Sequence, residues 1–227
     1  MRCAMRLSVV MPALQEEASI SSTLQRLASW RAQGHEVIVV DGGSSDDTAE
    51  QAAAGADRVL AGPRGRARQM NAGAAVAQGQ VLLFLHADTQ LPEGAAGLIQ
   101  QALGPGRVWG RFDVHIEGSS PMLRVVATLM NWRSRWSGIA TGDQAIFVRT
   151  DVFRQLGGYA DQPLMEDIEL SRRLLAFAKP VCLRQRVLTS GRRWQTKGVW
   201  RTIFLMWRLR WRYWRGESPE TLAQAYR

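Results

Sequence analysis

The segment VIVVDGGSSDDT, residues 37–48, decides the fold class of this chain. Its first four residues are β-branched and apolar without alternation, which is typical of a strand that is buried on both faces. Asp41 ends this run, two glycines allow another group to approach the backbone closely, and Ser44 or Ser45 is the predicted N-cap of a helix that starts near Asp46. A buried strand followed directly by a turn and a helix indicates an α/β fold.

The same alternation of strand and helix recurs through the first half of the chain. Apolar runs predict strands at 7–11, 37–40, 59–61 and 81–85, and helical spacing predicts helices at 18–32, 46–54 and 66–77. This order predicts a mostly parallel, Rossmann-like sheet with helices on both faces, in which ligands bind beyond the C-terminal ends of the strands. Further amphipathic helices are predicted at 121–136 and 199–215.

Composition places the chain among ordinary globular proteins with a basic surface. It has 227 residues, a formal net charge of +9 and 46% hydrophobic residues, which suits one large domain. Cys3 and Cys182 are too few for a disulfide framework or a cysteine-based metal site, so a cytoplasmic location is expected. Pro12 interrupts the short apolar stretch near the N-terminus, which argues against a signal peptide, and no run reaches the ~18 apolar residues of a membrane span.

The turn after the first strand excludes two classes of nucleotide-binding protein. It reads PALQEE, residues 12–17, and lacks the glycine fingerprint of a dinucleotide-binding dehydrogenase. No phosphate-binding Walker loop occurs in the chain, and the glycine-rich loop with arginine that a sugar-1-phosphate nucleotidyltransferase would carry here is also missing. The candidate site therefore depends on acidic residues at other strand ends and helix starts.

Taken in order, these acidic motifs resemble those of the inverting glycosyltransferases of family 2, which have the GT-A fold. The matching segments are SVVMP at 8–12 with Glu16-Glu17, VVDGGS at 39–44, HAD at 86–88, GGY at 157–159 and EDIEL at 166–170. The chain also resembles a small bacterial branch of unsettled acceptor that is sometimes linked to arsenosugar biosynthesis. The segments that mark this branch are GRARQMNAG at 65–73, FLHADT at 84–89 and GDQ at 142–144. The resemblance implies a GT-A domain over 1–195, followed by an amphipathic helical extension over 196–227.

The resemblance also implies where a nucleotide-diphosphate sugar binds, with UDP as the expected carrier. Asp41 would accept a hydrogen bond from a ring N–H of the base, and Pro12, Ala13, Glu16 and Gly43 would line the same pocket. The next helix would close the pocket with Arg66, Arg68, Gln69 and Asn71, and its guanidinium groups, together with that of Arg193 near the C-terminus, would be available to the phosphates. The alternative for the helix is a solvated basic face, and for Asp41 a residue that merely completes a well-capped turn.

The HAD motif corresponds to the DXD motif of the GT-A fold, with His86 in place of the first aspartate. The resemblance therefore implies that Asp88 binds Mg²⁺ or Mn²⁺ together with phosphate oxygens and water. Histidine is compatible with Mn²⁺, so it stays open whether His86 also touches the ion. The alternative is that Asp88 caps the turn before Leu91-Pro92.

The catalytic base implied by the resemblance is Asp167, with Glu166 orienting the site or the acceptor. An inverting transfer needs a base that takes the acceptor's proton on the face opposite the leaving group. Gly142, Asp143 and Gln144 would lie in the acceptor region. The alternatives are structural, since acids in the first turn of a helix stabilise it and Asp143 is a common turn residue.

The helix predicted at 199–215 carries a stripe of large apolar residues with arginines on both sides. The stripe comprises Trp200, Ile203, Phe204, Trp207, Trp211 and Trp214. Such a stripe predicts binding to an anionic membrane surface, here the inner face of the plasma membrane, or else packing on the domain or across a homodimer. A different class of function, a non-catalytic basic module for nucleic acid or anionic lipid, also fits the charge. Because no nucleic-acid-binding motif is visible, no nucleic-acid partner is expected.

Overall fold

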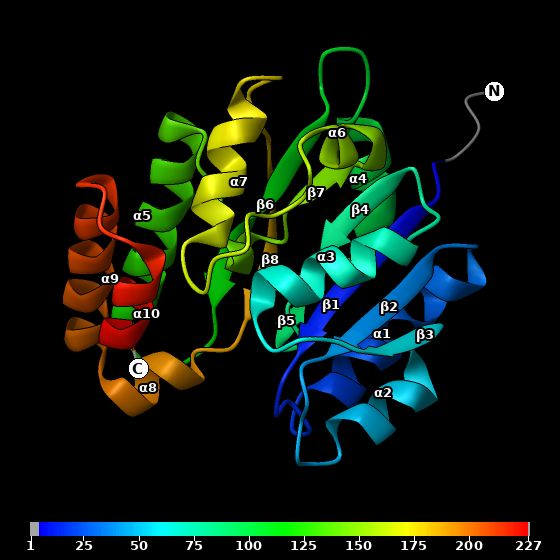
Figure 1. Cartoon of the computed structure of the whole chain (residues 1–227), viewed down its shortest axis with the longest axis horizontal. Helices are drawn as coiled ribbons and strands as arrows, with labels where there is room; N and C mark the ends of the chain where they lie inside the picture. Colours follow the sequence, from blue (N-terminus) through cyan, green and yellow to red (C-terminus); the bar gives the residue numbers. More distant parts are fainter. Residues whose placement is uncertain (1–4, 227) are drawn as a thin grey trace.

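An eight-stranded sheet forms the centre of the computed structural model, which describes residues 5–226 apart from the side chain of Arg193 (Figure 1). The strands are β1 (Leu7–Ala13), β2 (Glu36–Asp41), β3 (Arg58–Ala61), β4 (Val81–Phe84), β5 (Thr89–Gln90), β6 (Trp109–Ile116), β7 (Phe147–Arg149) and β8 (Val181–Thr189). Their order is β3-β2-β1-β4-β7-β6-β8-β5. The pairs from β3 to β4 are parallel, as is β6 with β8, whereas β7 is antiparallel to both β4 and β6.

Helices cover both faces of this sheet. They are α1 (Ile20–Ala32), α2 (Thr48–Gly55), α3 (Arg66–Val76), α4 (Ala95–Ala102), α5 (Met122–Ser137), α6 (Thr150–Gln155), α7 (Glu166–Leu175), α8 (Arg192–Lys197), α9 (Val199–Trp214) and α10 (Pro219–Tyr226), with a short 3₁₀ helix η1 (Gly142–Gln144). The strands and helices predicted in the first half are confirmed to within two residues at each end. The predicted α/β fold with a mostly parallel sheet is therefore confirmed.

Two apolar cores, one on each face of the sheet, explain why the strands show no alternation. In β1, Val9 and Met11 point into the core beneath α1, α4 and α5, whereas Val10 points into the core beneath α3, α6 and α7. All three side chains are fully buried. Since successive residues of a strand face opposite sides, burial on both faces requires every position to be apolar.

The prediction that Ser44 or Ser45 caps α2 is wrong. The helix starts at Thr48, and the Asp46 carboxylate accepts hydrogen bonds from both the backbone N–H and the hydroxyl of Thr48. Ser44 instead donates its hydroxyl hydrogen to Asp41 and accepts a hydrogen bond from the Gln15 N–H. The Ser44 hydroxyl thus connects the loops that follow β1 and β2 through these two hydrogen bonds.

The C-terminal helices pack on the main body through a third, smaller apolar cluster. In it, Leu209 of α9 and Leu222 of α10 are fully buried against Leu164, Met165 and Ile168 at the start of α7. The domain boundary after residue 195 stays a prediction, but the described part of the extension is seated on α7. None of the helices within residues 5–226 combines the length and the apolar character needed to cross a membrane.

Candidate active site

Strained backbone marks three loops around the candidate site: the loop after β1, the segment after η1 and the residue before α7. Among the described residues, three non-glycine residues have positive φ: Gln15 at 55°, Ala145 at 48° and Met165 at 65°. Gln15 follows β1, Ala145 follows η1, and Met165 directly precedes Glu166. Such strain persists where the surrounding structure holds the backbone in place and is frequent at active sites. These three segments therefore border the candidate site.

The start of α7 presents two adjacent carboxylates in different surroundings. Asp167 is half-buried, and its carboxylate accepts hydrogen bonds from the Gly142 N–H at 2.9 Å and the Ile168 N–H at 2.7 Å. Glu166 is buried and lies 3.5 Å from a guanidinium nitrogen of Arg66. Burial raises the pKa of Glu166, the negative charge of Asp167 raises it further, and Arg66 partly offsets both effects.

Of the predicted acceptor residues, Gly142 and Asp143 lie against His86 at the candidate site, whereas Gln144 lies in the core. Asp143 Oδ1 lies 3.4 Å from His86 Nδ1. Burial opposes ionisation of Asp143, but His86, Arg66 and Arg210 outweigh this effect and hold the pKa of its carboxyl below the ordinary value. Gly142 packs so closely on His86 that a Cβ there would lie 2.7 Å from the imidazole Nε2. Gln144 is fully buried, and its amide hydrogen-bonds to the Thr141 N–H and to Asn131 of α5.

Asp88 is the candidate metal ligand, and its surroundings limit what kind of ion it could hold. Its carboxylate has one long contact, 3.4 Å from the Thr89 hydroxyl, and its carbonyl accepts a hydrogen bond from the Ser190 N–H. Within residues 5–226, no three His, Cys, Asp or Glu side chains gather as a metal site. A single free carboxylate fits an ion that phosphate oxygens also coordinate, but not an ion held by protein alone. His86 is turned towards Asp143.

The loops after β1 and β2 meet at the predicted nucleotide pocket. Asp41 is largely buried and accepts hydrogen bonds from the Gly43 and Ser44 N–H groups, each at 3.0 Å. The Ala13 carbonyl, next to Pro12, accepts one from the Gly42 N–H at 2.9 Å. The Ser44 hydroxyl is a third donor to the Asp41 carboxylate. Since a carboxylate can accept about four hydrogen bonds, Asp41 completes the turn and has about one acceptor position left for a base.

Glu16 connects this loop region to the C-terminal part of the chain. Its carboxylate accepts a hydrogen bond from the Ser19 hydroxyl at 2.9 Å and lies 3.3 Å from a guanidinium nitrogen of Arg192 on α8. The side chain of Arg193 lies outside the described part of the structure. Its predicted contact with the diphosphate stays a prediction.

The four predicted residues of α3 have different surroundings, and only Arg66 reaches the acidic centre. Arg68 makes a two-pronged ion pair with the exposed Asp161, at 2.6 and 3.0 Å. Gln69 is buried, and its amide nitrogen donates to the carbonyls of Ala13 and Val40 at 2.8 Å. The Asn71 amide bonds to both the N–H and the carbonyl of Tyr159. The amides of Gln69 and Asn71 thus hold the loop after β1 and the backbone of Tyr159, and their predicted place in the pocket lining stays a prediction.

Three residues beside the acidic centre were not predicted: Tyr159, Arg133 and Arg210. Tyr159 is buried, and burial together with the charges of Glu166 and Asp167 raises the pKa of its phenol well above the ordinary value. Arg133 of α5 and Arg210 of α9 both interact electrostatically with Asp167. One signal could have found Arg133, which lies seven residues after the buried Val126 and so on the same helix face.

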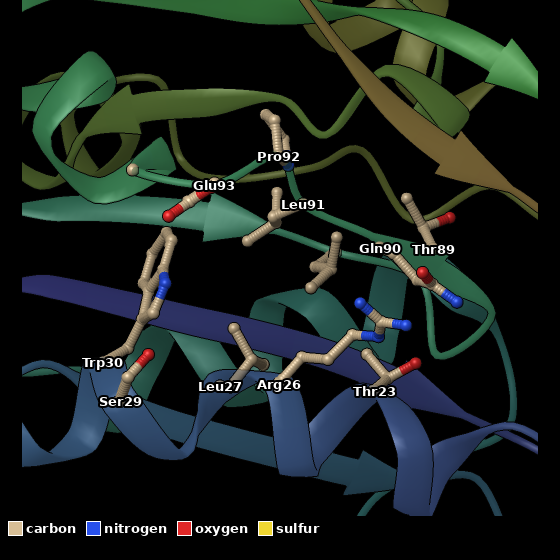
Figure 2. A pocket seen from close by; sticks show the side chains of 12 residues that line it. Thr23, Arg26, Leu27, Ser29, Trp30, Thr89, Gln90, Leu91, Pro92 and Glu93 are labelled. Atoms are coloured by element: carbon tan, nitrogen blue, oxygen red, sulfur yellow. The ribbon is translucent and has the colours of Figure 1, made fainter.

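Figure 2 shows a cavity of about 280 Å³ in another part of the molecule, between α1 and the segment of residues 89–94. Arg26 and Trp30 of α1 face Glu93 and Pro92 across it (Figure 2). None of the predicted site residues lines this cavity. We therefore place the candidate site at the strand ends and not in this cavity.

Comparisons with known proteins identify the family of this chain. The family model described as Glycosyl transferase family 2 matches residues 8–157, which include the loops after β1, β2 and β4 and the η1 helix. The probable glycosyltransferase YdaM of Bacillus subtilis (strain 168) is 28% identical over 240 residues, covering 94% of this chain and 55% of that protein. The chain thus spans about half the length of this curated relative.

Two solved structures share the fold at low sequence identity. The mannosyltransferase PcManGT from Pyrobaculum calidifontis, in complex with GDP-Man and Mn²⁺, is 17% identical with a TM-score of 0.67, over 99% of this chain and 70% of that one. S. aureus TarS 1-349 in complex with UDP is 17% identical with a TM-score of 0.62, over 82% of this chain and 60% of that one. At this level of identity, the likeness shows the GT-A fold.

Proposed function

The chain belongs to glycosyl transferase family 2, and on this premise we propose that it is an inverting enzyme that moves a sugar from a nucleotide-diphosphate donor to an acceptor. The observation that carries the proposal is the position of Asp167. Its carboxylate is held by Gly142 of η1 and by Ile168 of α7, beside the acidic and basic groups described above. A half-buried carboxylate held in this way is suited to accept a proton from an attacking hydroxyl.

For the donor, we propose a UDP-linked sugar bound at the ends of β1, β2 and β4. The solved neighbours carry GDP-Man with Mn²⁺ in one case and UDP in the other, both of which are nucleotide diphosphates. Asp41 would accept a hydrogen bond from the base, and Asp88 would hold Mg²⁺ or Mn²⁺. When bound, such an ion neutralises charge on the diphosphate leaving group. Arg66, which reaches Glu166, is placed to move between that carboxylate and a phosphate.

We also propose that α9 lies on an anionic membrane surface, at the inner face of the plasma membrane. Five aromatic side chains of α9 are between 56% and 71% exposed: Trp200, Phe204, Trp207, Trp211 and Trp214. These five aromatic side chains are therefore not packed into the described part of the chain, residues 5–226. Ile203, by contrast, packs on the core and is not part of the exposed stripe. Arg210 interacts electrostatically with Asp167. Exposed Arg201, Arg208 and Arg215 remain beside the aromatics, as expected for binding to anionic headgroups.

The test of the proposed reaction is nucleotide release from UDP-, GDP- and dTDP-sugars, with Mn²⁺ or Mg²⁺ and with water as the acceptor. We expect slow, metal-dependent release from the preferred donor. Asp167→Asn keeps the shape of the side chain but cannot take a proton, so it should lower turnover by roughly 10²- to 10⁴-fold while donor binding is retained. Glu166→Gln should have a smaller effect.

Two outcomes would change this assignment. If Glu166→Gln lowers turnover more than Asp167→Asn, the base is Glu166. If no donor is bound or hydrolysed with either metal, while a polyanion or anionic vesicles alone raise the melting temperature, the chain is a basic binding module and not a transferase.

A further inference from the structure

Two arginines next to Asp167 have no carboxylate partner. Arg133 comes from α5 and Arg210 from α9, and neither forms an ion pair within residues 5–226, in contrast to Arg66, which pairs with Glu166. The Nε and Nη2 atoms of Arg133 are buried and have no hydrogen-bond partner in the described part of the chain. An arginine carries five N–H donors and stays charged, so unpaired donors in a buried position cost free energy.

The fold brings these two guanidinium groups within electrostatic range of each other and of Asp167. Leu209 is fully buried against Met165 and Ile168, which seats α9 on the start of α7 and brings the next residue, Arg210, beside Asp167. Burial lowers the pKa of Arg133, and repulsion by Arg210 contributes to this, so that it falls to about 10. Burial likewise lowers the pKa of Arg210, although Asp167 and Asp143 counteract this.

The carboxylates nearby are already engaged by other groups. Asp167 accepts two backbone hydrogen bonds, Asp143 lies against His86, and Glu166 lies against Arg66. Asp167 attracts both arginines but forms no ion pair with either, and the buried Nε and Nη2 donors of Arg133 stay unused within the described residues. A phosphate or a carboxylate would satisfy both, since its oxygens match the planar fork of a guanidinium.

We propose that Arg133 and Arg210 bind an anionic group, a phosphate or a carboxylate, that the sugar acceptor carries near its attacking hydroxyl. This inference rests on the proposed function, because the acceptor is placed here by the assignment of Asp167 as the base. The diphosphate of the donor is the competing occupant. The nucleotide pocket, however, lies at the β1–β2 side of the sheet, whereas α5 and α9 lie at the opposite end of the molecule (Figure 1).

The experiment measures two kinds of binding on the full chain by calorimetry. UDP with Mn²⁺ reports on the donor site. Glycerol 1-phosphate then serves as the soluble anionic probe, titrated with and without UDP–Mn²⁺, with glycerate as the carboxylate probe and glycerol as the neutral match. Vesicles of phosphatidylglycerol, compared with phosphatidylcholine, present the same phosphate chemistry as a lipid headgroup. The variants are Arg133→Gln and Arg210→Gln, with Arg124→Gln, an exposed arginine of α5, as the charge-matched control.

We expect the parent chain to bind an anionic probe but not glycerol. Arg133→Gln and Arg210→Gln should each weaken this binding at least about tenfold, as expected for a charge-assisted hydrogen bond, while UDP binding stays unchanged. Arg124→Gln should behave as the parent in the soluble titrations. Dependence on the two arginines with the soluble probes indicates a soluble acceptor, and dependence only with phosphatidylglycerol vesicles indicates a lipid acceptor.

Three results would overturn the proposal: no anionic probe binds, both variants bind the probes as the parent does, or both variants lose UDP binding instead. The third result would assign the arginines to the donor's diphosphate. If the parent binds no UDP, the donor assignment fails, yet the titrations without UDP still report on the arginine site. Arg133→Met adds a readout independent of any ligand. It removes an unpaired buried charge, so it should raise the melting temperature, whereas a structural arginine would lower it.

Discussion

At the scale of single residues, the carboxylates of the site differ in their hydrogen-bond partners, and we expect them to have different functions. Asp41 ends β2 and Asp88 lies between β4 and β5, but Asp41 is enclosed by backbone N–H groups and Asp88 keeps an almost free carboxylate. The first is suited to a hydrogen bond with a base, and the second to an ion shared with phosphate. The two residues should therefore affect donor binding in different ways.

We predict that Asp88→Ala removes the Mn²⁺-dependent part of UDP binding and leaves the fold intact, since this side chain contributes little to the core. Asp41→Ala should weaken UDP binding even without metal. Titration calorimetry with UDP, with and without Mn²⁺, distinguishes the two effects. Equal affinity of both variants and the parent would remove the proposed donor site from these strand ends.

Glu166 provides a second test at this scale, through the pH dependence of stability. Its pKa is raised above the ordinary value of 4.5, because burial and the charge of Asp167 disfavour the ionised form. The stability that protonated Glu166 contributes is therefore fully present below pH 4.5 and is lost as the pH rises through the higher pKa of the folded state. Glu166→Gln mimics the protonated form at every pH.

We accordingly expect the melting temperature of Glu166→Gln to match that of the parent near pH 4 and to exceed it increasingly towards pH 7. Differential scanning fluorimetry across this range measures the difference. Glu50→Gln, an exposed change on α2, controls for the loss of one negative charge. A difference that shrinks as the pH rises would mean that Arg66 stabilises the carboxylate more than burial destabilises it.

At the scale of elements, the packing of α3 on the sheet depends on one glycine. A Cβ at Gly73 would lie 2.5 Å from Cγ1 of Val10 and 3.1 Å from Cγ2 of Val40, so α3 approaches β1 and β2 as closely as glycine permits. This close approach positions Gln69 to donate a hydrogen bond to the Ala13 carbonyl, and it positions Arg66 beside Glu166. The position of one helix thus determines both the support and the charge of the site.

Gly73→Ala should therefore lower the free energy of unfolding by about 1–3 kcal/mol, the usual cost of overpacking. Gly97→Ala in α4 is the matched control, because a Cβ there meets no atom within 4 Å. It should raise the free energy of unfolding by roughly 0.5–1 kcal/mol, as expected for alanine in a helix. Urea denaturation measures both changes, and equal effects would show that α3 can move away from the sheet at little cost.

The aromatic stripe of α9 gives the second prediction at this scale. Trp207→Glu combined with Trp211→Glu should reduce co-sedimentation with vesicles that contain anionic lipid, while the chain stays folded and monodisperse. Binding by the parent should fall as salt rises and be weak on phosphatidylcholine. If the double variant binds vesicles normally but dissociates an oligomer in light scattering, the stripe is a dimer interface.

At the scale of the whole molecule, the parts that could be predicted from sequence are those governed by local periodicity. Residues 37–40 are apolar at every position because both faces of β2 are covered, and this pattern is visible without the structure. The pairing of Thr89 in β5 with Thr189 in β8 joins residues one hundred positions apart and leaves no local signal. Sequence reasoning therefore predicted the parallel part of the sheet but not its far edge.

The candidate site shows the same limit. Asp88 and Glu166-Asp167 could be proposed because motif order marks them, whereas Arg210 resembles the outer arginines of any amphipathic helix. Spacing places Arg133 on the buried face of α5 but does not reveal that Asp167 lies within its electrostatic range. For the same reason, the spacing of Gln69 and Asn71 did not reveal that their amides bond to backbone groups.

The antiparallel strand β7 lies between β4 and β6 and joins the parallel strands β1–β4 to the strands β6 and β8. The two sides of the sheet are encoded largely by separate stretches of the gene. On the proposed assignment, contacts to the donor are encoded up to Asp88, apart from the predicted contact of Arg193 with the diphosphate, and those to the acceptor are encoded from Arg133 onwards. Selection for a new acceptor can thus act on the second stretch of the gene while the first is inherited unchanged. A chimera that joins two relatives between β5 and β6 should keep the donor preference of one parent and take the acceptor preference of the other.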